Sequence, residues 1–351
     1  RISHTDFGGR AISGWSYGCQ SGCQSGWVSN GVITDSSCDS HGTHCASTAA
    51  GVTYGVAKGA TIVPIQVLDC NGGGSSASVI AGLDAVYSMS VAVGAPSIAS
   101  LSLGGGFSAL ENSAVATTHA RGINVVVAAG NEAADACGTS PASAAAAITV
   151  GATNMADSFD TSYSNFGSCV DILAPGTGVV AAIASSDSAV AALTGTSMAT
   201  PAVAGALAQL RGLYPSYSAT RAADTVVCMA STGVLSNVPA DTPDKLLWAG
   251  SAFTESSNVQ CNFPPNPMPP PSPSPAPPGR LCANTCYWRH DTECDDGGLG
   301  AEWAECGLGT DCTDCGLRGD PDYVLVTPPP SPPLPPPSPP SPPPPRPSPP
   351  P

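Results

Sequence analysis

In its first half the chain alternates apolar runs with segments in which apolar side chains recur every three or four positions. The apolar runs predict buried strands at 60–68, 97–103 and 123–128, and the helical spacing predicts helices over 75–90 and 109–121. Continuous apolar strands separated by helices are typical of a parallel sheet covered on both faces. We therefore expect an α/β fold whose active site lies at the carboxyl ends of the strands.

A further helix is predicted from Met198, where small and apolar residues continue to Leu210 and Tyr214-Pro215 then ends the pattern. Pro201 falls in the expected first turn, where a missing N–H costs little. Ser197 precedes this helix, at the end where unpaired N–H groups and the helix dipole favour an anion. That position suits an N-cap serine or a nucleophile, and the serine alone does not decide between them.

Two histidines lie where a loop runs into a predicted helix of small residues, in Asp39-Ser40-His41-Gly42-Thr43-His44. The first should face the cleft and the second, three residues later, should face inward. We therefore expect His41 to be a catalytic base and His44 to be structural. The alternatives are two core histidines, or a metal pair for which no further ligand stands at an obvious spacing.

An amide follows the third predicted strand, in Ala128-Ala129-Gly130-Asn131. A donor at the carboxyl end of a strand is what a developing oxyanion needs. The alternative is a turn residue after glycine.

The composition argues against some classes of protein and favours a secreted one. A chain of 351 residues predicts more than one domain, and a net charge of −15 argues against a nucleic-acid partner. No apolar run reaches the length of a membrane span. Fifteen cysteines indicate an oxidising compartment. With neither an initiator Met nor a signal peptide, the sequence is expected to be a mature chain or a fragment of a secreted protein.

The composition also predicts four parts. Residues 1–260 form the α/β domain, and 261–279 form a Pro/Ser-rich linker. Residues 280–322 contain six cysteines, which allow 15 disulfide connectivities, and acidic side chains that either bind calcium or form a solvated surface. Residues 323–351 form a Pro/Ser-rich disordered tail.

Taken together, His41, Asn131 and Ser197 with their neighbours resemble the subtilases, the subtilisin-like serine proteases, and most of all their proteinase K/aqualysin-like branch. The resemblance runs from Arg1 to about Leu247. It includes Ser102-Leu103-Gly104-Gly105, Ser140-Pro141-Ala142-Ser143, Thr149-Val150-Gly151-Ala152, Tyr163-Ser164-Asn165-Phe166-Gly167 and Leu173-Ala174-Pro175-Gly176. It implies a doubly wound domain with a mostly parallel central sheet and helices on both faces.

The resemblance also implies roles for individual residues. Ser197 would attack the peptide carbonyl, His41 would take its proton and pass it to the leaving amine, and Asn131 would hold the oxyanion with the Ser197 N–H. The substrate backbone would pair with Ser102, Leu103 and Gly104. One wall of the main specificity pocket would be formed by Ala128, Ala129 and Gly130.

One expected residue of the triad is not found. His4-Thr5-Asp6-Phe7-Gly8-Gly9-Arg10 matches the segment that follows the catalytic Asp in the family. The resemblance thus places that Asp just upstream of Arg1, outside this sequence, since Asp6, Asp35 and Asp39 fall at the wrong positions. We expect the chain as it stands to be inactive on its own.

The resemblance pairs Cys38 with Cys70 and Cys137 with Cys169, and it makes Cys45 a buried free thiol. Cys19 with Cys23 and Cys228 with Cys261 are the remaining candidate pairs in this domain. A structural Ca²⁺ site is implied at Asp171, completed by carbonyls near Ala145 and Ala147. The alternative for Asp171 is a solvated side chain.

The function implied is a secreted, monomeric serine endopeptidase that hydrolyses extracellular proteins and needs no catalytic cofactor. Residues 280–351 resemble proline-rich cell-wall proteins of green algae and would bind extracellular matrix or cell-wall glycoproteins. The alternative is an inactive matrix-binding or structural protein that keeps the protease fold. An α/β-hydrolase is excluded because Gly195-Thr196-Ser197-Met198-Ala199 is not Gly-x-Ser-x-Gly and His precedes Ser.

Overall fold

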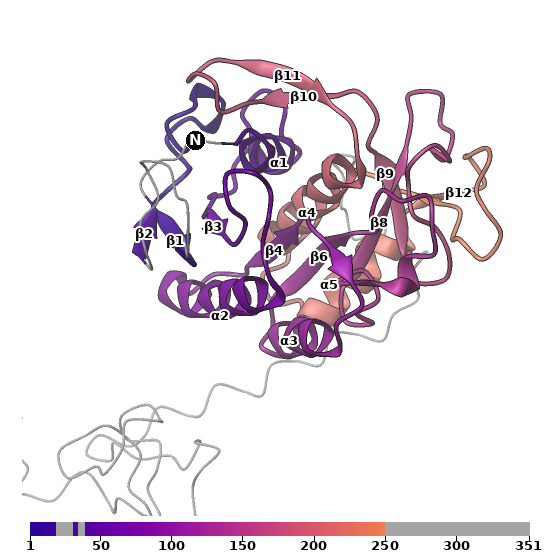
Figure 1. Ribbon diagram of the computed structural model, residues 1–351, viewed down its shortest axis with the longest axis horizontal. Coiled ribbons are helices and arrows are strands. Elements are labelled where there is room, and N and C mark those ends of the chain that lie inside the picture. The colour runs from indigo at the N-terminus through magenta and orange to yellow at the C-terminus, as the bar shows by residue number, and fades with distance from the viewer. Residues whose placement is uncertain (19–30, 34–38, 250–260, 262–351) are drawn as a thin grey trace, which may run out of the picture. The chain divides into compact units, whose positions relative to one another are not determined.

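The computed structural model describes residues 1–18, 31–33, 39–249 and 261, with the backbone alone for 31–33. All of them belong to one unit, Arg1–Pro267 (Figure 1). Several predictions lie outside the described residues: the linker beyond Cys261, the six-cysteine module, the tail, and Cys19, Cys23, Asp35 and Cys38.

A sheet of six strands forms the centre of the described part. Its strands are β4 (Ile98–Leu101), β6 (Asn124–Ala128), β8 (Ile148–Thr153), β9 (Ile172–Pro175), β12 (Ser231–Thr232) and β13 (Lys245–Leu246). They lie in the order β12-β13-β9-β8-β6-β4. Every neighbouring pair from β13 to β4 is parallel, and only β12 is antiparallel to its neighbour. The predicted mostly parallel sheet is therefore confirmed.

Helices cover both faces of this sheet, as alternate residues of β6 show. Val126 packs in one apolar cluster with α4 (Thr196–Leu213) and α5 (Ala219–Cys228). Val125 and Val127 point to the other face and pack with α2 (Ser76–Val93) and α3 (Ala109–Ala120). Successive strand residues face opposite sides, so a strand that is apolar throughout is buried on both. The doubly wound α/β architecture is confirmed.

The two helices on the second face begin at serine caps. Ser75 and Ser78 form a reciprocal capping box at the start of α2, and the Ser108 hydroxyl accepts the N–H of Glu111 at the start of α3. Gly122 follows the end of α3 with a φ of 86°, a conformation that glycine adopts without strain.

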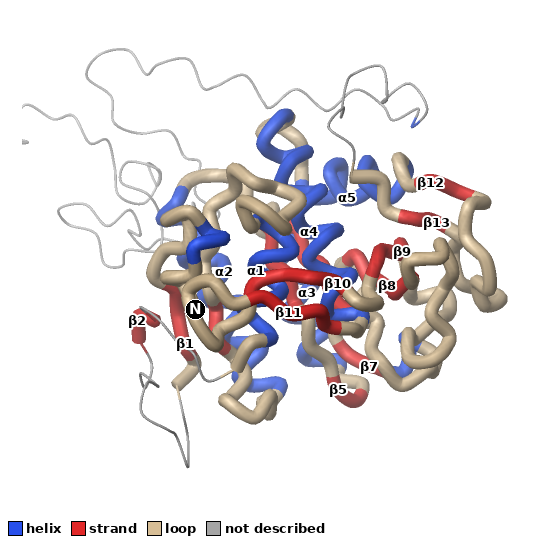
Figure 2. The backbone as a smooth tube through the Cα atoms, turned by 90° about the horizontal axis from the view of Figure 1, so that it is seen from above, coloured by secondary structure: helices blue, strands red, loops and turns tan. Residues whose placement is uncertain are grey.

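The remaining elements are short. They are η1 (Thr5–Phe7), β1 (Gly14–Ser16), β2 (Gly31–Ile33), α1 (His41–Ala50), β3 (Ile65–Gln66), β5 (Gly105–Gly106), η2 (Ala136–Gly138), β7 (Thr139–Ser140), β10 (Val179–Ala182) and β11 (Val190–Leu193). Helix α1 packs against α4 and β10, and the β10–β11 hairpin lies across it (Figures 1 and 2).

The strand predicted at 60–68 is much shorter in the structure. Only Ile65 and Gln66 form a strand, in a separate sheet of order β2-β1-β3, and Ile62 and Leu68 each make a single bridge. Pro64 explains the interruption, because proline donates no ladder hydrogen bond. Its carbonyl still accepts the N–H of Trp15 at 3.0 Å.

Helix α4 starts two residues earlier than predicted. It begins at Thr196, so Ser197 lies inside the first turn and is not its cap, which is Gly195. Pro201 therefore lies in the second turn of α4, and not in the first turn as the sequence predicts. There its missing N–H leaves one helical carbonyl without its usual partner. The predicted end is confirmed, with Tyr214 as the C-cap.

One described helix, α2, is long and apolar enough in composition to cross a membrane, although the sequence prediction found no such segment. Its side chains Val79 and Leu83 pack in the core against α3 and β6.

Candidate active site

The loops that follow three strands, β4, β6 and β9, begin at the carboxyl edge of the sheet. Ser102 directly follows β4, Asn131 stands three residues after β6, and Gly176 directly follows β9. The Gly176 carbonyl accepts the N–H of Gly195 at 2.9 Å and so brings the start of α4 to this edge. Loops at the carboxyl ends of parallel strands are where open α/β sheets place their ligands.

Ser197 lies at this edge, half-buried, in the first turn of α4. Its hydroxyl points to the Ser102 carbonyl, with Oγ and O 3.5 Å apart. No other hydrogen bond of this hydroxyl is found among the described residues. The N-terminal turn gives it backbone N–H groups and the positive end of the helix dipole.

His41 is the first residue of α1, and its N–H donates to Asp39 Oδ1 at 2.6 Å. Cys45 follows it by one turn on the same helical face, and the Cys45 Sγ lies 3.4 Å from the Ser197 carbonyl. That face of α1 therefore points to the start of α4. His41 and Ser197 share no hydrogen bond here, as is common in unliganded active sites. Burial lowers the pKa of His41 and outweighs the charge of Asp39, which raises it.

His44 lies in the interior, with its side chain fully buried. Its Nε2 is 2.9 Å from the Val179 carbonyl in β10, and Nδ1 has no hydrogen-bond partner within the described part of the chain. Burial is the main cause that lowers the pKa of His44. This histidine thus joins α1 to the β10–β11 hairpin.

Asn131 is oriented by Thr196, the residue before Ser197. The Asn131 Oδ1 accepts the Thr196 N–H at 2.8 Å and the Thr196 hydroxyl at 3.0 Å. The assignment of oxygen and nitrogen follows from these two donors. With its oxygen held in this way, the amide leaves its NH₂ group available beside the N-terminus of α4, where an oxyanion would accept from it.

The loop that carries Asn131 is anchored by Asn165, which is fully buried. Its Oδ1 accepts the N–H groups of Glu132 and Ala134, both at 3.0 Å. Its Nδ2 donates to the Ala129 carbonyl at 3.0 Å and to Glu132 Oε2 at 2.7 Å. All donors and acceptors of the amide are therefore used on one loop.

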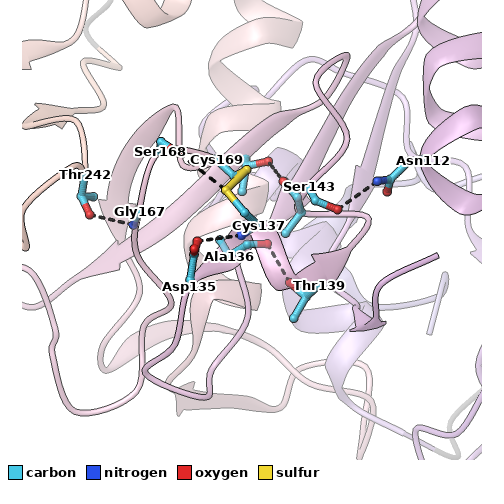
Figure 3. The surroundings of a disulfide bond; sticks show 12 residues. Asn112, Asp135, Ala136, Cys137, Thr139, Ser143, Gly167, Ser168, Cys169 and Thr242 are labelled. Atoms are coloured by element: carbon cyan, nitrogen blue, oxygen red, sulfur yellow. Dashed lines mark hydrogen bonds between the residues drawn. A yellow bond between two sulfur atoms is a disulfide. The ribbon is translucent and has the colours of Figure 1, made fainter. Parts of the chain in front are cut away.

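Gly130 makes this close packing possible. Its φ is 108°, and a Cβ at this position would collide with the Asn165 amide. The segment 163–169 then runs beside the loop, and the disulfide between Cys137 and Cys169 joins the two farther along (Figure 3). The main-chain conformation around Asn131 is thus fixed from both sides.

The predicted substrate-binding residues lie at the same edge. Ser102 and Leu103 are half-buried and Gly104 is exposed, directly after β4, which is the outermost strand of the described sheet. Ala128 and Ala129 are buried, and the half-buried Gly130 donates its N–H to the Thr196 hydroxyl at 3.3 Å. The pairing of 102–104 with substrate and the pocket role of 128–130 stay predictions.

Neither of the two described N-terminal aspartates contacts the His41 ring. Asp6 is buried and accepts from the Ser47 hydroxyl at 2.6 Å and the Thr53 N–H at 2.7 Å. Asp39 is exposed and accepts the main-chain N–H of His41. Asp6 is a structural group between η1 and α1, and Asp39 acts on the base only through its charge.

Asp171 directly precedes β9, and its Oδ2 accepts the Thr149 N–H at 2.8 Å. Burial raises the pKa of Asp171, against the Thr149 N–H and the charge of Lys245, which both lower it. No group of three His, Cys, Asp or Glu side chains suited to a metal occurs among the described residues. The Ca²⁺ site at Asp171 with the carbonyls of Ala145 and Ala147, an all-oxygen ligand set of the kind that Ca²⁺ prefers, stays a prediction.

The described cysteines form two complete disulfides, Cys137–Cys169 and Cys228–Cys261. Cys70 is also disulfide-bonded, and its implied partner, Cys38, lies outside the described residues. Cys45 is a free thiol, and burial raises its pKa to about 11. It is therefore protonated at neutral pH and a poor nucleophile.

Two residues that orient this site, Thr196 and Asn165, have no role in the predictions from sequence. Thr196 was visible only as a neighbour of Ser197. Asn165 stood in Tyr163-Ser164-Asn165-Phe166-Gly167, a segment used for the resemblance without a role for its amide. An Asn between apolar and small residues, shortly before a strand, was the available signal.

Comparisons with known proteins agree with this geometry. The profile of the Subtilase family matches residues 24–248. The chain is 43% identical over 247 residues to an extracellular serine proteinase of a Thermus species, a match covering 70% of this chain and 57% of that protein. It is 40% identical over 247 residues to alkaline serine exoprotease A of Vibrio alginolyticus, covering 70% of this chain and 43% of that protein.

A solved structure of a cold-adapted subtilisin-like serine proteinase shares the fold, with a TM-score of 0.64 and 39% identity. That match covers 71% of this chain and 85% of the solved chain. The chain spans about half the length of the Thermus and Vibrio relatives, 57% and 43%. The matched profile covers well over half of the chain, and the site residues lie within it. The chain belongs to the subtilase family.

Proposed function

We propose that this protein is a serine endopeptidase that cleaves peptide bonds through an acyl-enzyme on Ser197. The observation that carries the proposal is the amide of Asn131, whose oxygen is held by Thr196 so that its NH₂ group remains available next to Ser197. An N-cap serine or a turn asparagine would need no such arrangement. The names of the Thermus and Vibrio relatives, both serine proteases, support the proposal.

In this reaction Ser197 Oγ attacks the substrate carbonyl while His41 takes the hydroxyl proton. The carbonyl oxygen becomes an oxyanion, which accepts from the Asn131 NH₂ group and the Ser197 N–H. His41 then passes the proton to the leaving amine, and water releases the acyl group by the same route. We assign the carboxylate that orients His41 to the Asp that the resemblance places just upstream of Arg1. No catalytic cofactor takes part.

The substrate backbone pairs with 102–104, and a bulky apolar side chain lies against 128–130. We further propose that the protein is a secreted monomer, in line with the extracellular Thermus relative. Residues 280–351 attach it to extracellular matrix or cell-wall glycoproteins. A structural Ca²⁺ is held by Asp171 and the carbonyls of Ala145 and Ala147.

Digestion of an unfolded protein by the full-length gene product tests the function. We expect internal cleavage, seen as new peptide termini by mass spectrometry, and loss of cleavage in Ser197→Ala. A full-length product that is folded and shows no cleavage would support the alternative, an inactive matrix-binding protein. Residual cleavage by Ser197→Ala would assign the activity to another residue.

A further inference from the structure

The carbonyl of Ser197 lacks its helical partner. In an α-helix it would accept the N–H of the residue four positions later, which is Pro201. Proline has no N–H to give. Thr196, Met198 and Pro201 around this carbonyl are buried, so another donor is needed to avoid an unpaired polar group.

Two side chains from other elements supply donors. The Ser102 hydroxyl donates to the Ser197 carbonyl at 2.8 Å, and the Cys45 thiol approaches it at 3.4 Å. A hydroxyl is the stronger donor of the two. The thiol also lies beside the Ser102 side chain, and its raised pKa of about 11 keeps it protonated at neutral pH.

This carbonyl is where three parts of the candidate site meet. Ser102 directly follows β4 and begins the predicted substrate edge, Cys45 lies one turn after His41 in α1, and Ser197 belongs to α4. Holding the carbonyl fixes the peptide plane that follows Ser197, and with it the direction of the nucleophile. The contact is reciprocal, because Ser197 Oγ points to the Ser102 carbonyl at 3.5 Å.

We propose that Ser102 is a positioning residue, whose hydroxyl replaces the helical hydrogen bond that Pro201 cannot make and so holds Ser197 in its reactive position. This role belongs to the side chain and is separate from main-chain pairing with substrate. Its effect on catalysis rests on the proposed function, whereas the hydrogen bond itself does not.

A double-mutant cycle of Ser102→Ala and Pro201→Ala tests whether the Ser102 hydroxyl replaces the helical N–H that Pro201 lacks. In the full-length product, Ser102→Ala should lower the rate constant for labelling by a fluorophosphonate about five- to tenfold. Pro201→Ala restores the helical N–H, so adding Ser102→Ala to it should lower the rate by about twofold or less. Ser102→Thr keeps the hydroxyl and should label faster than Ser102→Ala. An equal loss from Ser102→Ala in both backgrounds would overturn the proposal.

Steady-state peptide hydrolysis separates positioning from substrate binding. The loss in Ser102→Ala should fall on kcat with KM unchanged, because the substrate edge is main chain and remains. Ser97→Ala is the matched control, since its hydroxyl bonds the Ala95 carbonyl at 3.1 Å just before the other end of β4. That control should match the wild type. A rise in KM with unchanged kcat would contradict the positioning role.

Thermal unfolding keeps this proposal distinguishable from the proposed function. If the wild type neither cleaves substrate nor reacts with the fluorophosphonate, the proposed function is wrong. The Tm values of the wild type, Ser102→Ala, Pro201→Ala and the double variant still test the hydrogen bond. Ser102→Ala should lower Tm more in the Pro201 background than in the Pro201→Ala background. Identical Tm losses in both backgrounds would overturn the hydrogen-bond replacement, whether or not the protein is an enzyme.

Discussion

Asn131 and Thr196 are joined twice, because Asn131 Oδ1 accepts both the N–H and the hydroxyl of Thr196, at 2.8 and 3.0 Å. One residue before the nucleophile therefore sets the direction of the amide that would bind the oxyanion. The orientation comes from the fold itself and needs no substrate. These two hydrogen bonds link the loop after β6, which carries Asn131, to the start of α4, which carries Ser197. The proposed reaction needs both residues side by side.

Thr196→Val removes the hydroxyl and keeps the N–H and the shape of the side chain. We expect kcat to fall about three- to tenfold with KM nearly unchanged, since one of two bonds that orient Asn131 is lost. Asn131→Leu should lower kcat more, by about 10²–10³, the loss known for the oxyanion-hole asparagine of subtilisin. Steady-state kinetics with a peptide substrate measures both. A larger loss from Thr196→Val than from Asn131→Leu would contradict the arrangement.

Asn165→Asp tests the anchor of the oxyanion loop. The variant keeps the acceptor oxygen, but it replaces the donor that faces the Ala129 carbonyl and Glu132 Oε2 with a second acceptor. We expect a loss of about 2–4 kcal/mol in the free energy of unfolding at neutral pH.

This loss should shrink as the pH falls. The new carboxyl, placed beside Glu132, would have a folded-state pKa above its unfolded value of about 3.9. The destabilisation is therefore present above the folded pKa and disappears as protonation restores a donor at lower pH. Tm of variant and wild type between neutral pH and about pH 4 measures this trend. Asn154→Asp is the control, since Asn154 is half-buried directly before an exposed turn and its side chain accepts the Ala156 N–H, and it should show no such trend. A pH-independent deficit in Asn165→Asp would argue against the contact between Asn165 Nδ2 and Glu132 Oε2.

The pH profile should report the effect of Asp39 on the pKa of His41. The base must be neutral, and within residues 1–351 burial lowers its pKa while the charge of Asp39 raises it in part. The carboxylate proposed to orient His41 in the full-length product would raise this pKa as well, so the test compares the acidic limbs of kcat/KM in the wild type and a variant of Asp39. Asp39→Asn removes the charge and keeps an acceptor for the His41 N–H, so its acidic limb should move to lower pH. A shift toward higher pH would contradict this electrostatic assignment.

The Cys137–Cys169 bond should stabilise the domain and support the loop of Asn131. Replacing both cysteines with Ser opens a loop with a sequence separation of 32. The expected cost is about 3–4 kcal/mol, or about 10 °C in Tm. Replacing Cys228 and Cys261, with a separation of 33, is the matched control. Both variants should lose Tm similarly, but only the first should also label more slowly, and equal labelling rates would refute the link to the loop.

The proposed Ca²⁺ site predicts a loss of Tm on chelation that is restored by added Ca²⁺. Asp171→Asn should remove this dependence, because a neutral amide binds the cation much more weakly. Asp84→Asn is the control, since Asp84 is exposed on α2 and pairs with Arg121 at 3.5 Å. If chelation leaves the Tm of the wild type unchanged, the proposed Ca²⁺ site is wrong.

The sheet and its covering helices could be predicted because strands such as Val125-Val126-Val127 are apolar on both faces and alternate with helical segments, which is typical of a parallel sheet covered on both faces. The strand at 60–68 was overestimated because apolar content does not reveal the ladder bond lost at Pro64. The start of α4 was missed by two residues because Thr196 and Ser197 favour caps in isolation, and here Gly195 precedes them with its N–H held by Gly176.

The sequence predicts which residues form the site better than it predicts how their side chains are oriented. The residues His41, Asn131 and Ser197 were recognisable by type and order. Three groups orient these residues: the Thr196 and Ser102 side chains and the Asn165 amide. They do so through hydrogen bonds between residues that lie 31 to 95 positions apart in the sequence. Nothing in local spacing reveals such contacts.

The central claim is that Ser197 is the nucleophile, and one measurement addresses it directly. The full-length product is treated with a fluorophosphonate, and the modified peptide is identified by mass spectrometry in the wild type, His41→Ala and Ser197→Ala. The account predicts one adduct on Ser197 in the wild type, much slower labelling in His41→Ala and none in Ser197→Ala. An adduct on another residue, or labelling that survives Ser197→Ala, would contradict it.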